Sequence, residues 1–148
     1  MAQPGDVNIL LIENNRDHAE FTLKALTDAN ASNRTYWVRD GEDALDFLHH
    51  RRRWADPASA PRPSLIVLDI NVPKIDGHAI LKHVKESESL RDIPVVMLTT
   101  SSKPAEVTAS YRAGADGFIT KPIDFREFIS RINSLQTSWA STSGRPSA

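Results

Sequence analysis

The sequence predicts an α/β fold in which a five-stranded parallel sheet is covered by helices on both faces. Short runs of apolar and β-branched residues alternate with segments in which apolar residues recur at helical spacing. Runs without polar alternation are typical of strands buried on both faces, as in parallel sheets. Because crossovers between parallel strands are right-handed, few topologies remain. The predicted strands are residues 8–12, 35–38, 65–69, 95–98 and 117–119.

The segments between these strands are expected to be helices. Asn14 or Asn15 is the expected N-cap of the first helix, and a capping box at Asp124 and Glu127 begins the last. Residues 49–64 carry three prolines and are expected to form a long connector without regular structure, which is uncommon in compact domains. The apolar positions that define the helices are Ala19, Leu23, Leu26, Ala44, Leu45, Leu48, Ile80, Leu81, Val84, Val107, Tyr111, Phe125, Phe128, Ile129, Ile132, Leu135 and Trp139.

Length and composition favour one domain without membrane or nucleic-acid partners. The chain has 148 residues, no cysteine and a formal net charge of −1, which excludes disulfides and thiolate metal sites. The start lacks the pattern of a signal peptide, and no apolar stretch approaches the roughly 18 residues of a membrane span. We therefore expect a cytoplasmic protein. The expected layout is a flexible N-terminus at 1–6, a domain at 7–139 and a disordered tail at 140–148, too short for an output domain.

Polar side chains follow four of the predicted strands. Glu13 follows the first strand, Asp69 ends the third, Thr99 follows the fourth and Lys121 follows the fifth. Ligands of open α/β sheets bind at the carboxyl ends of the strands, so acid groups, the amide of Asn14, a hydroxyl and an amine are expected around one point. That set suits phosphate chemistry. Taken alone, a strand-end aspartate is as well explained as the cap of a turn.

In this arrangement the chain resembles the receiver domains of two-component response regulators. The matching residues, which also include Pro122, span most of residues 7–139. The resemblance implies a flavodoxin-like five-stranded sheet. The proline-bearing connector and the long last helix are similar to those of the regulators paired with cyanobacterial and bacterial phytochromes. The motif residues between the third strand and the next helix are Asp69, Asn71, Pro73, Asp76 and Gly77.

The resemblance implies that Asp69 accepts a phosphoryl group from a histidine kinase. Mg²⁺ would be held by Asp69, by Glu13 directly or through water, and by the Asn71 backbone carbonyl, because hard cations prefer oxygen ligands. Lys121 would pair with a phosphate oxygen, and the Lys121–Pro122 peptide would be cis. The chain departs from the family at Asn14, where a second acid is usual. The amide oxygen of Asn14 can still ligate the cation but brings no charge, so we expect weakened Mg²⁺ binding.

Signalling is expected to pass through Thr99 and Phe118. In the family the threonine hydroxyl turns toward the phosphoryl group, and an aromatic ring on the fifth strand takes the vacated space. Phe118 lacks the hydroxyl of tyrosine and gains no solvent hydrogen bond outside, so we expect it to face inward. Leu135 and Trp139 extend past the sheet edge and are the expected homodimer contacts.

Three other functions are alternatives to the phosphoacceptor. A pseudo-receiver would keep the fold and only bridge proteins, which the change at Asn14 favours slightly. An aspartyl-phosphate phosphatase needs a second acid at position 71, which is Asn71 here. A flavodoxin needs a Ser-, Thr- and Gly-rich loop after the first strand. The resemblance therefore predicts a non-enzymatic regulator whose partner is a sensor histidine kinase, with a bacteriophytochrome as the leading choice.

The basic run 51–53 and the five histidines are expected at the surface. The basic run 51–53 is expected to be a solvated helix end favoured by the helix dipole, with a partner contact as the minority reading. The five histidines lack a spacing that converges on the acids, so they are expected on helix faces and not as ligands: His18, His49, His50, His78 and His83. Trp54 is expected to pack the connector down.

Overall fold

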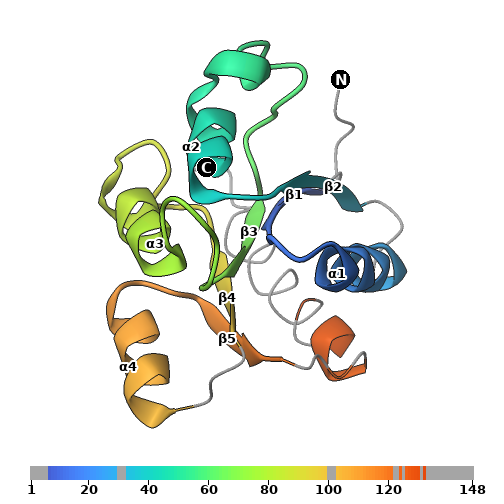
Figure 1. The fold of residues 1–148 in the computed structure, drawn as a ribbon, viewed down its shortest axis with the longest axis vertical. Helices are drawn as coiled ribbons and strands as arrows, with labels where there is room; N and C mark the ends of the chain where they lie inside the picture. The colour runs from blue at the N-terminus through green and yellow to red at the C-terminus, as the bar shows by residue number, and fades with distance from the viewer. Residues whose placement is uncertain are drawn as a thin grey trace, which may run out of the picture.

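Five parallel strands form one sheet in the order β2-β1-β3-β4-β5 (Figure 1). The computed structural model describes residues 7–29, 33–99, 103–121, 124, 126–130 and 132. The predicted fold class is confirmed, and each predicted strand is present with its ends moved by no more than two residues. The strands are β1 Val7–Ile12, β2 Asn33–Val38, β3 Leu65–Asp69, β4 Val95–Thr99 and β5 Gly117–Thr120.

Helices cover both faces of this sheet, as Figure 1 shows. Helices α2 and α3, with Val107 of α4, pack on one face, while α1 and the helical residues 126–130 and 132 pack on the other. The first helix ends close to its predicted boundary, and Gly114 follows the fourth with φ 108, as expected for a C-terminal stop. The helices are α1 Arg16–Ala29, α2 Gly41–His49, α3 Gly77–Glu86 and α4 Pro104–Arg112.

Alternate residues of the central strands belong to the cores on opposite faces of the sheet. On β1, Leu10 and Ile12 belong to the core beneath α2 and α3, whereas Ile9 and Leu11 belong to the core beneath α1. All four are 0% exposed. Burial of each such side chain stabilises the fold by about 1.5–3 kcal/mol. The centre of the sheet is therefore a firm support for the residues at its carboxyl edge.

Side-chain caps begin the helices beside that edge. Asn15 Oδ1 accepts from His18 N at 3.0 Å, so Asn15 rather than Asn14 caps α1. Asp76 caps α3 in the same way, with Oδ1 accepting from Ala79 N at 3.0 Å. Asp124 Oδ1 accepts from Glu127 N at 2.9 Å, which confirms that aspartate as a cap. Each cap satisfies a donor that the first turn leaves unpaired.

Two glycines hold the loop after β3 against the sheet and α2. Gly77 N donates to Ile70 O at 2.9 Å, and a Cβ on Gly77 would lie 2.5 Å from Ile70 Cα. Gly41 N donates to Pro73 O at 3.1 Å, and a Cβ there would overlap Ile75 O. Since any side chain would collide with backbone at both positions, the path of this loop is fixed.

The connector after α2 differs from its prediction. It contains a 3-10 helix, η1 (Arg52–Trp54), instead of lacking regular structure. Trp54 does pack the segment down, with its ring centroid 4.9 Å from that of Phe47 and Nε1 donating to Asp43 at 2.9 Å. The acids that hold this segment are Asp43 and Asp46 of α2. Helical periodicity does not predict which residues such acids bind.

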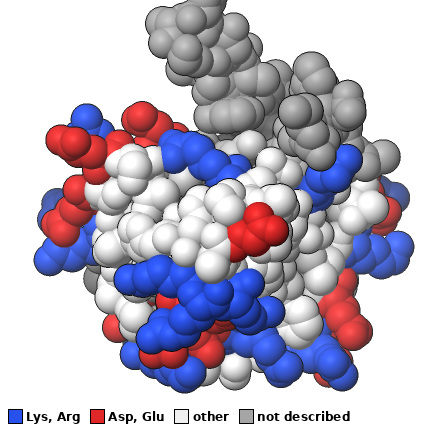
Figure 2. Space-filling view, turned by 90° about the horizontal axis from the view of Figure 1, so that it is seen from above, with Lys and Arg blue, Asp and Glu red and all other residues white. Residues whose placement is uncertain are grey.

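The basic run is also not a simple solvated helix end. Arg52 Nη1 donates to both oxygens of Asp46 at 2.8 and 3.0 Å, and Arg53 donates to both oxygens of Asp43. Figure 2 shows basic side chains interleaved with acidic ones on this face. The Arg53 pair uses two nitrogens and is bidentate, which fixes geometry as well as charge, while Arg52 donates to Asp46 through one nitrogen. Both arginines hold the connector to α2.

Some predictions fall outside the part of the chain that the structure describes. These are the N-terminus 1–6, the tail 140–148, Pro122 and the dimer residues Leu135 and Trp139. Across the described ranges, no helix has both the length and the apolar character needed to cross a membrane.

Candidate functional site

Three strand ends bring Glu13, Asp69 and Lys121 together. Lys121 Nζ donates to Glu13 Oε1 at 2.5 Å and to Asp69 Oδ2 at 2.7 Å. Glu13 is 1% exposed, Asp69 6% and Lys121 8%. Lys121 reaches Asp69 even though β4 lies between β3 and β5 in the sheet. The strand-end argument thus places these three side chains correctly. The result is a buried ammonium shared by two carboxyl groups.

The backbone holds the second oxygen of each carboxyl group. Asp69 Oδ1 accepts from Asn71 N at 2.8 Å, and Glu13 Oε2 accepts from Asn15 N at 3.2 Å. Both donors belong to the loops that directly follow the two strands. Each carboxyl group is thereby oriented toward the other and toward Lys121.

Burial acts in the same direction on both acids, but their hydrogen bonds move the two pKa values apart. Loss of water, followed by the neighbouring Asp69, raises the pKa of Glu13 to about 7 despite the opposing bond from Lys121. Burial also acts to raise the pKa of Asp69, but bonds with Glu13, Lys121 and Asn71 outweigh it and hold that pKa below its ordinary value. The bonds from Lys121 and from Asn71 N thus favour the charged form of Asp69, which is the form that can act as a nucleophile.

Thr99 and Phe118 lie on the neighbouring strands β4 and β5. Thr99 ends β4 and is 2% exposed, and its carbonyl accepts from Lys121 N at 2.6 Å. Phe118 is 6% exposed and belongs to the core beneath α2 and α3. A buried ring agrees with the inward orientation expected from the sequence. The part these two residues play in a switch stays a prediction.

The oxygen donors around Asp69 fit a hard divalent cation. Two carboxyl groups lie together and the pKa of one is raised to about 7, so a cation here would relieve the repulsion between them. Asn14 is exposed beside Glu13, and Asn71 is exposed two residues after Asp69. No group of three or more His, Cys, Asp or Glu side chains that could hold a metal occurs among the described residues. Remaining ligands from this region would be neutral oxygens.

One residue of this site was missed by the sequence analysis. His18 is an exposed helix-face residue of α1, as expected, but its Nδ1 lies 3.0 Å from Lys121 Nζ, a contact that the sequence did not predict. Spacing hid it because the two residues are 103 positions apart. The available signal was its place in the first turn of the helix that follows Glu13, because that turn lies at the same edge of the sheet.

The other histidine contacts lie away from the acids. His49 Nε2 and His83 Nε2 are 2.7 Å apart and join α2 to α3. Burial, with help from the nearby His83 charge, lowers the pKa of His49. His50 Nε2 contacts Ala60 O at 2.8 Å and so ties the end of α2 to the connector.

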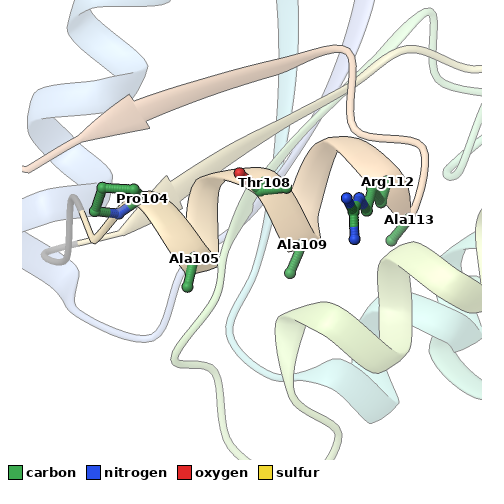
Figure 3. Close-up of a pocket in the computed structure, with 6 residues that line it drawn as sticks. All are labelled: Pro104, Ala105, Thr108, Ala109, Arg112 and Ala113. Carbon is green, nitrogen blue, oxygen red and sulfur yellow. The ribbon is translucent and has the colours of Figure 1, made fainter.

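A hollow of about 680 Å³ runs along α4 (Figure 3). Its lining includes small side chains on one side of the helix, such as Ala105 and Ala109, and the guanidinium of Arg112. None of its lining residues is a predicted site residue.

The parallel sheet, the buried acid pair and the lysine between them define a signalling receiver module. The chain belongs to the family of response regulator receiver domains, which matches residues 9–133. This family is one of regulatory domains and not of catalytic enzymes.

Several relatives of known structure share most of this chain. It is 38% identical to the bacteriophytochrome response regulator RtBRR, with a TM-score of 0.78, covering 88% of this chain and 78% of that one. It is 31% identical to the phosphorylated cyanobacterial phytochrome response regulator RcpA, with a TM-score of 0.77, covering 93% and 96%.

A third relative has been solved with a metal. Response regulator Rcp1 of Synechocystis sp. is 31% identical over 140 residues, which cover 95% of this chain and 93% of that protein. Its Mn²⁺-bound form has a TM-score of 0.75 and covers 90% of this chain and 94% of that one. Phytochrome response regulators are thus among the relatives of this chain, as the connector and last helix had suggested.

Proposed function

We propose that Asp69 accepts a phosphoryl group from the phosphohistidine of a sensor kinase. The observation that carries this is the buried Lys121 ammonium 2.7 Å from Asp69 Oδ2, at the ligand-binding edge of the sheet. In the reaction an Asp69 oxygen attacks phosphorus, the phosphorus–nitrogen bond breaks, and the imidazole leaves with the electron pair. Lys121 stabilises charge on the phosphoryl oxygens, which is the main demand of such transfers.

Mg²⁺ is the proposed cofactor. Asp69, Glu13, Asn14 and the Asn71 carbonyl are the oxygen donors that would hold it, a hard set of the kind Mg²⁺ prefers. When bound, a divalent cation neutralises part of the negative charge on the phosphoryl oxygens. The Mn²⁺-bound form of Rcp1 supports divalent-metal binding in this group of proteins.

Restoring the second acid will tighten metal binding. A carboxylate ~4 Å from a unit positive charge is worth about 4 kcal/mol at an effective dielectric near 20 before desolvation. After desolvation we expect Asn14→Asp to lower the Kd for Mg²⁺ by about tenfold. Trp37 Nε1 donates to Glu13 O at 2.7 Å, so tryptophan fluorescence during a Mg²⁺ titration is a natural readout, with calorimetry as a check.

The matched control makes the same charge change one residue further on. Asn15→Asp adds an acid that keeps the cap on α1, so we expect a smaller gain in affinity. Equal Mg²⁺ affinities for wild type and Asn14→Asp would refute the idea that Asn14 weakens the site.

The proposed partner is a bacteriophytochrome-type histidine kinase. The support comes from the relatives RtBRR and RcpA, which are phytochrome response regulators. We further propose that phosphorylation shifts Thr99 and Phe118 and so alters protein contacts, because a phosphoryl group adds about 1.5–2 negative charges. Homodimerisation through Leu135 and Trp139 belongs to the same proposal.

Mass spectrometry after incubation with acetyl phosphate and Mg²⁺ tests phosphoryl uptake directly. We expect wild type to gain one phosphoryl group and Asp69→Asn to gain none, because an amide is a poor nucleophile. The pseudo-receiver is the second candidate, favoured by the missing acid at Asn14. Absence of the mass gain in wild type would establish that alternative in place of the phosphoacceptor.

A further inference from the structure

The imidazole of His18 completes the set of acceptors around the Lys121 ammonium. Nζ donates to Glu13 at 2.5 Å and to Asp69 at 2.7 Å, and His18 Nδ1 lies 3.0 Å away. An ammonium has three N–H donors and no acceptor, so three partners use all of its donors. Nδ1 must therefore present its lone pair to Lys121, which places the imidazole hydrogen on Nε2.

The first turn of α1 holds His18 in place from both sides. His18 N donates to Asn15 Oδ1 at 3.0 Å, and Thr22 Oγ1 donates to His18 O at 2.8 Å. The next residue, Ala19, is 0% exposed, as is Thr22. The backbone of His18 thus belongs to a capped helix that is packed on the sheet, and its exposed side chain reaches Lys121 from that fixed starting point.

We propose that His18 is a positioning residue that orients Lys121 for phosphoryl uptake by Asp69; this inference rests on the proposed function. A lysine ammonium is a point charge on a flexible stem, and two acceptors leave its third donor free to turn. A neutral third acceptor fixes the ammonium without cancelling its charge. When a phosphoryl oxygen replaces Asp69 Oδ2 as acceptor, Glu13 and His18 still hold the other two donors. Preorganised donors of this kind are what charge stabilisation requires.

Two substitutions distinguish the effect of the acceptor nitrogen from the effect of the volume of the ring. His18→Phe keeps a ring but has no acceptor, whereas His18→Asn places an amide oxygen where Nδ1 lies. With acetyl phosphate at saturating Mg²⁺, we expect the initial rate of uptake to fall about three- to tenfold in His18→Phe, as for loss of one hydrogen bond. We expect His18→Asn to stay within about twofold of wild type for the same reason.

A second measurement needs no phosphodonor. Hydrogen exchange of the Lys121 ammonium, followed by ¹⁵N NMR, will be faster in His18→Phe than in wild type, and His18→Asn will restore slow exchange. An uptake rate in His18→Phe equal to wild type would overturn this inference alone. Equal losses in the Phe and Asn variants would indicate packing and would also overturn it. Absence of uptake in wild type itself would overturn both this inference and the proposed function.

Discussion

Replacing Lys121 with methionine will slow phosphoryl uptake by Asp69 by about a hundredfold or more. The ammonium is the buried positive charge beside the acceptor, 2.7 Å from Oδ2, and removal of one preorganised charge-stabilising donor typically costs about 10²- to 10³-fold in rate. Methionine keeps much of the length and volume of the side chain but donates no hydrogen bond. Initial rates of mass gain from acetyl phosphate, at saturating Mg²⁺, measure the effect.

Lys74→Met is the matched control for this change. Lys74 also lies near Asp69 in the sequence, but its side chain is 55% exposed and pairs with Asp40 and Glu42 at 3.6 and 3.7 Å. Exposed pairs of this type contribute little, so its uptake rate should match wild type. If Lys121→Met and Lys74→Met had equal rates, the role given to the buried ammonium would be wrong.

The free energy of unfolding of Lys121→Met will also depend more strongly on pH than that of wild type. In wild type the pKa of Glu13 is raised from 4.5 to about 7, so between these values the folded state keeps a proton that the unfolded state has lost. The free energy of unfolding contributed by Glu13 therefore falls as pH rises through this window. The bond from Lys121 acts to lower this pKa. Lys121→Met will extend the window upward, and urea unfolding from about pH 5 to about pH 8 will show a larger loss than in wild type.

The sequence could predict which site residues lie at the ends of strands. Buried apolar runs predict strands, and a parallel sheet brings its carboxyl ends to one edge, so Glu13, Asp69 and Lys121 could be placed together in advance. The first turn after Glu13 could have placed His18 at the same edge, but its contact with Lys121 could not be predicted, because that contact depends on how α1 is rotated and packed on the sheet. Periodicity tells which face of a helix is apolar but not which polar residue of its first turn reaches a neighbouring strand.

The contacts that hold the connector to α2 could not be predicted from the sequence, for a similar physical reason. Asp43 and Asp46 occupy α2, and helical periodicity alone does not distinguish a solvated acid from one that holds another segment. The structure pairs them with Arg53 and Arg52, and Asp43 also accepts from Trp54. These are contacts between a helix and a later segment, which depend on the path of the chain and not on local pattern.

Gly77→Ala will reduce both the stability of the fold and the rate of phosphoryl uptake. A Cβ at this position would lie 2.5 Å from Ile70 Cα and 2.8 Å from Asp69 O, and backbone atoms cannot move aside as a flexible side chain can. We expect the free energy of unfolding to drop by about 3 kcal/mol, the upper end of ordinary overpacking costs. Because the displaced carbonyl belongs to the acceptor residue, uptake from acetyl phosphate should slow as well. Urea unfolding and initial rates measure the two effects.

Gly114→Ala separates these two consequences. Gly114 has φ 108, and a Cβ there would meet the Lys85 side chain at 2.8 Å, so alanine is strained and the fold should again lose stability. That site is at the end of α4, and the side chain it meets bonds to Asp116 at 3.1 Å and to Ile93 O at 2.8 Å, not to the acid pair. We therefore expect Gly114→Ala to lose stability while folded protein keeps the wild-type rate. Equal slowing in both variants would mean that global stability, and not the fixed backbone beneath Asp69, limits phosphoryl uptake.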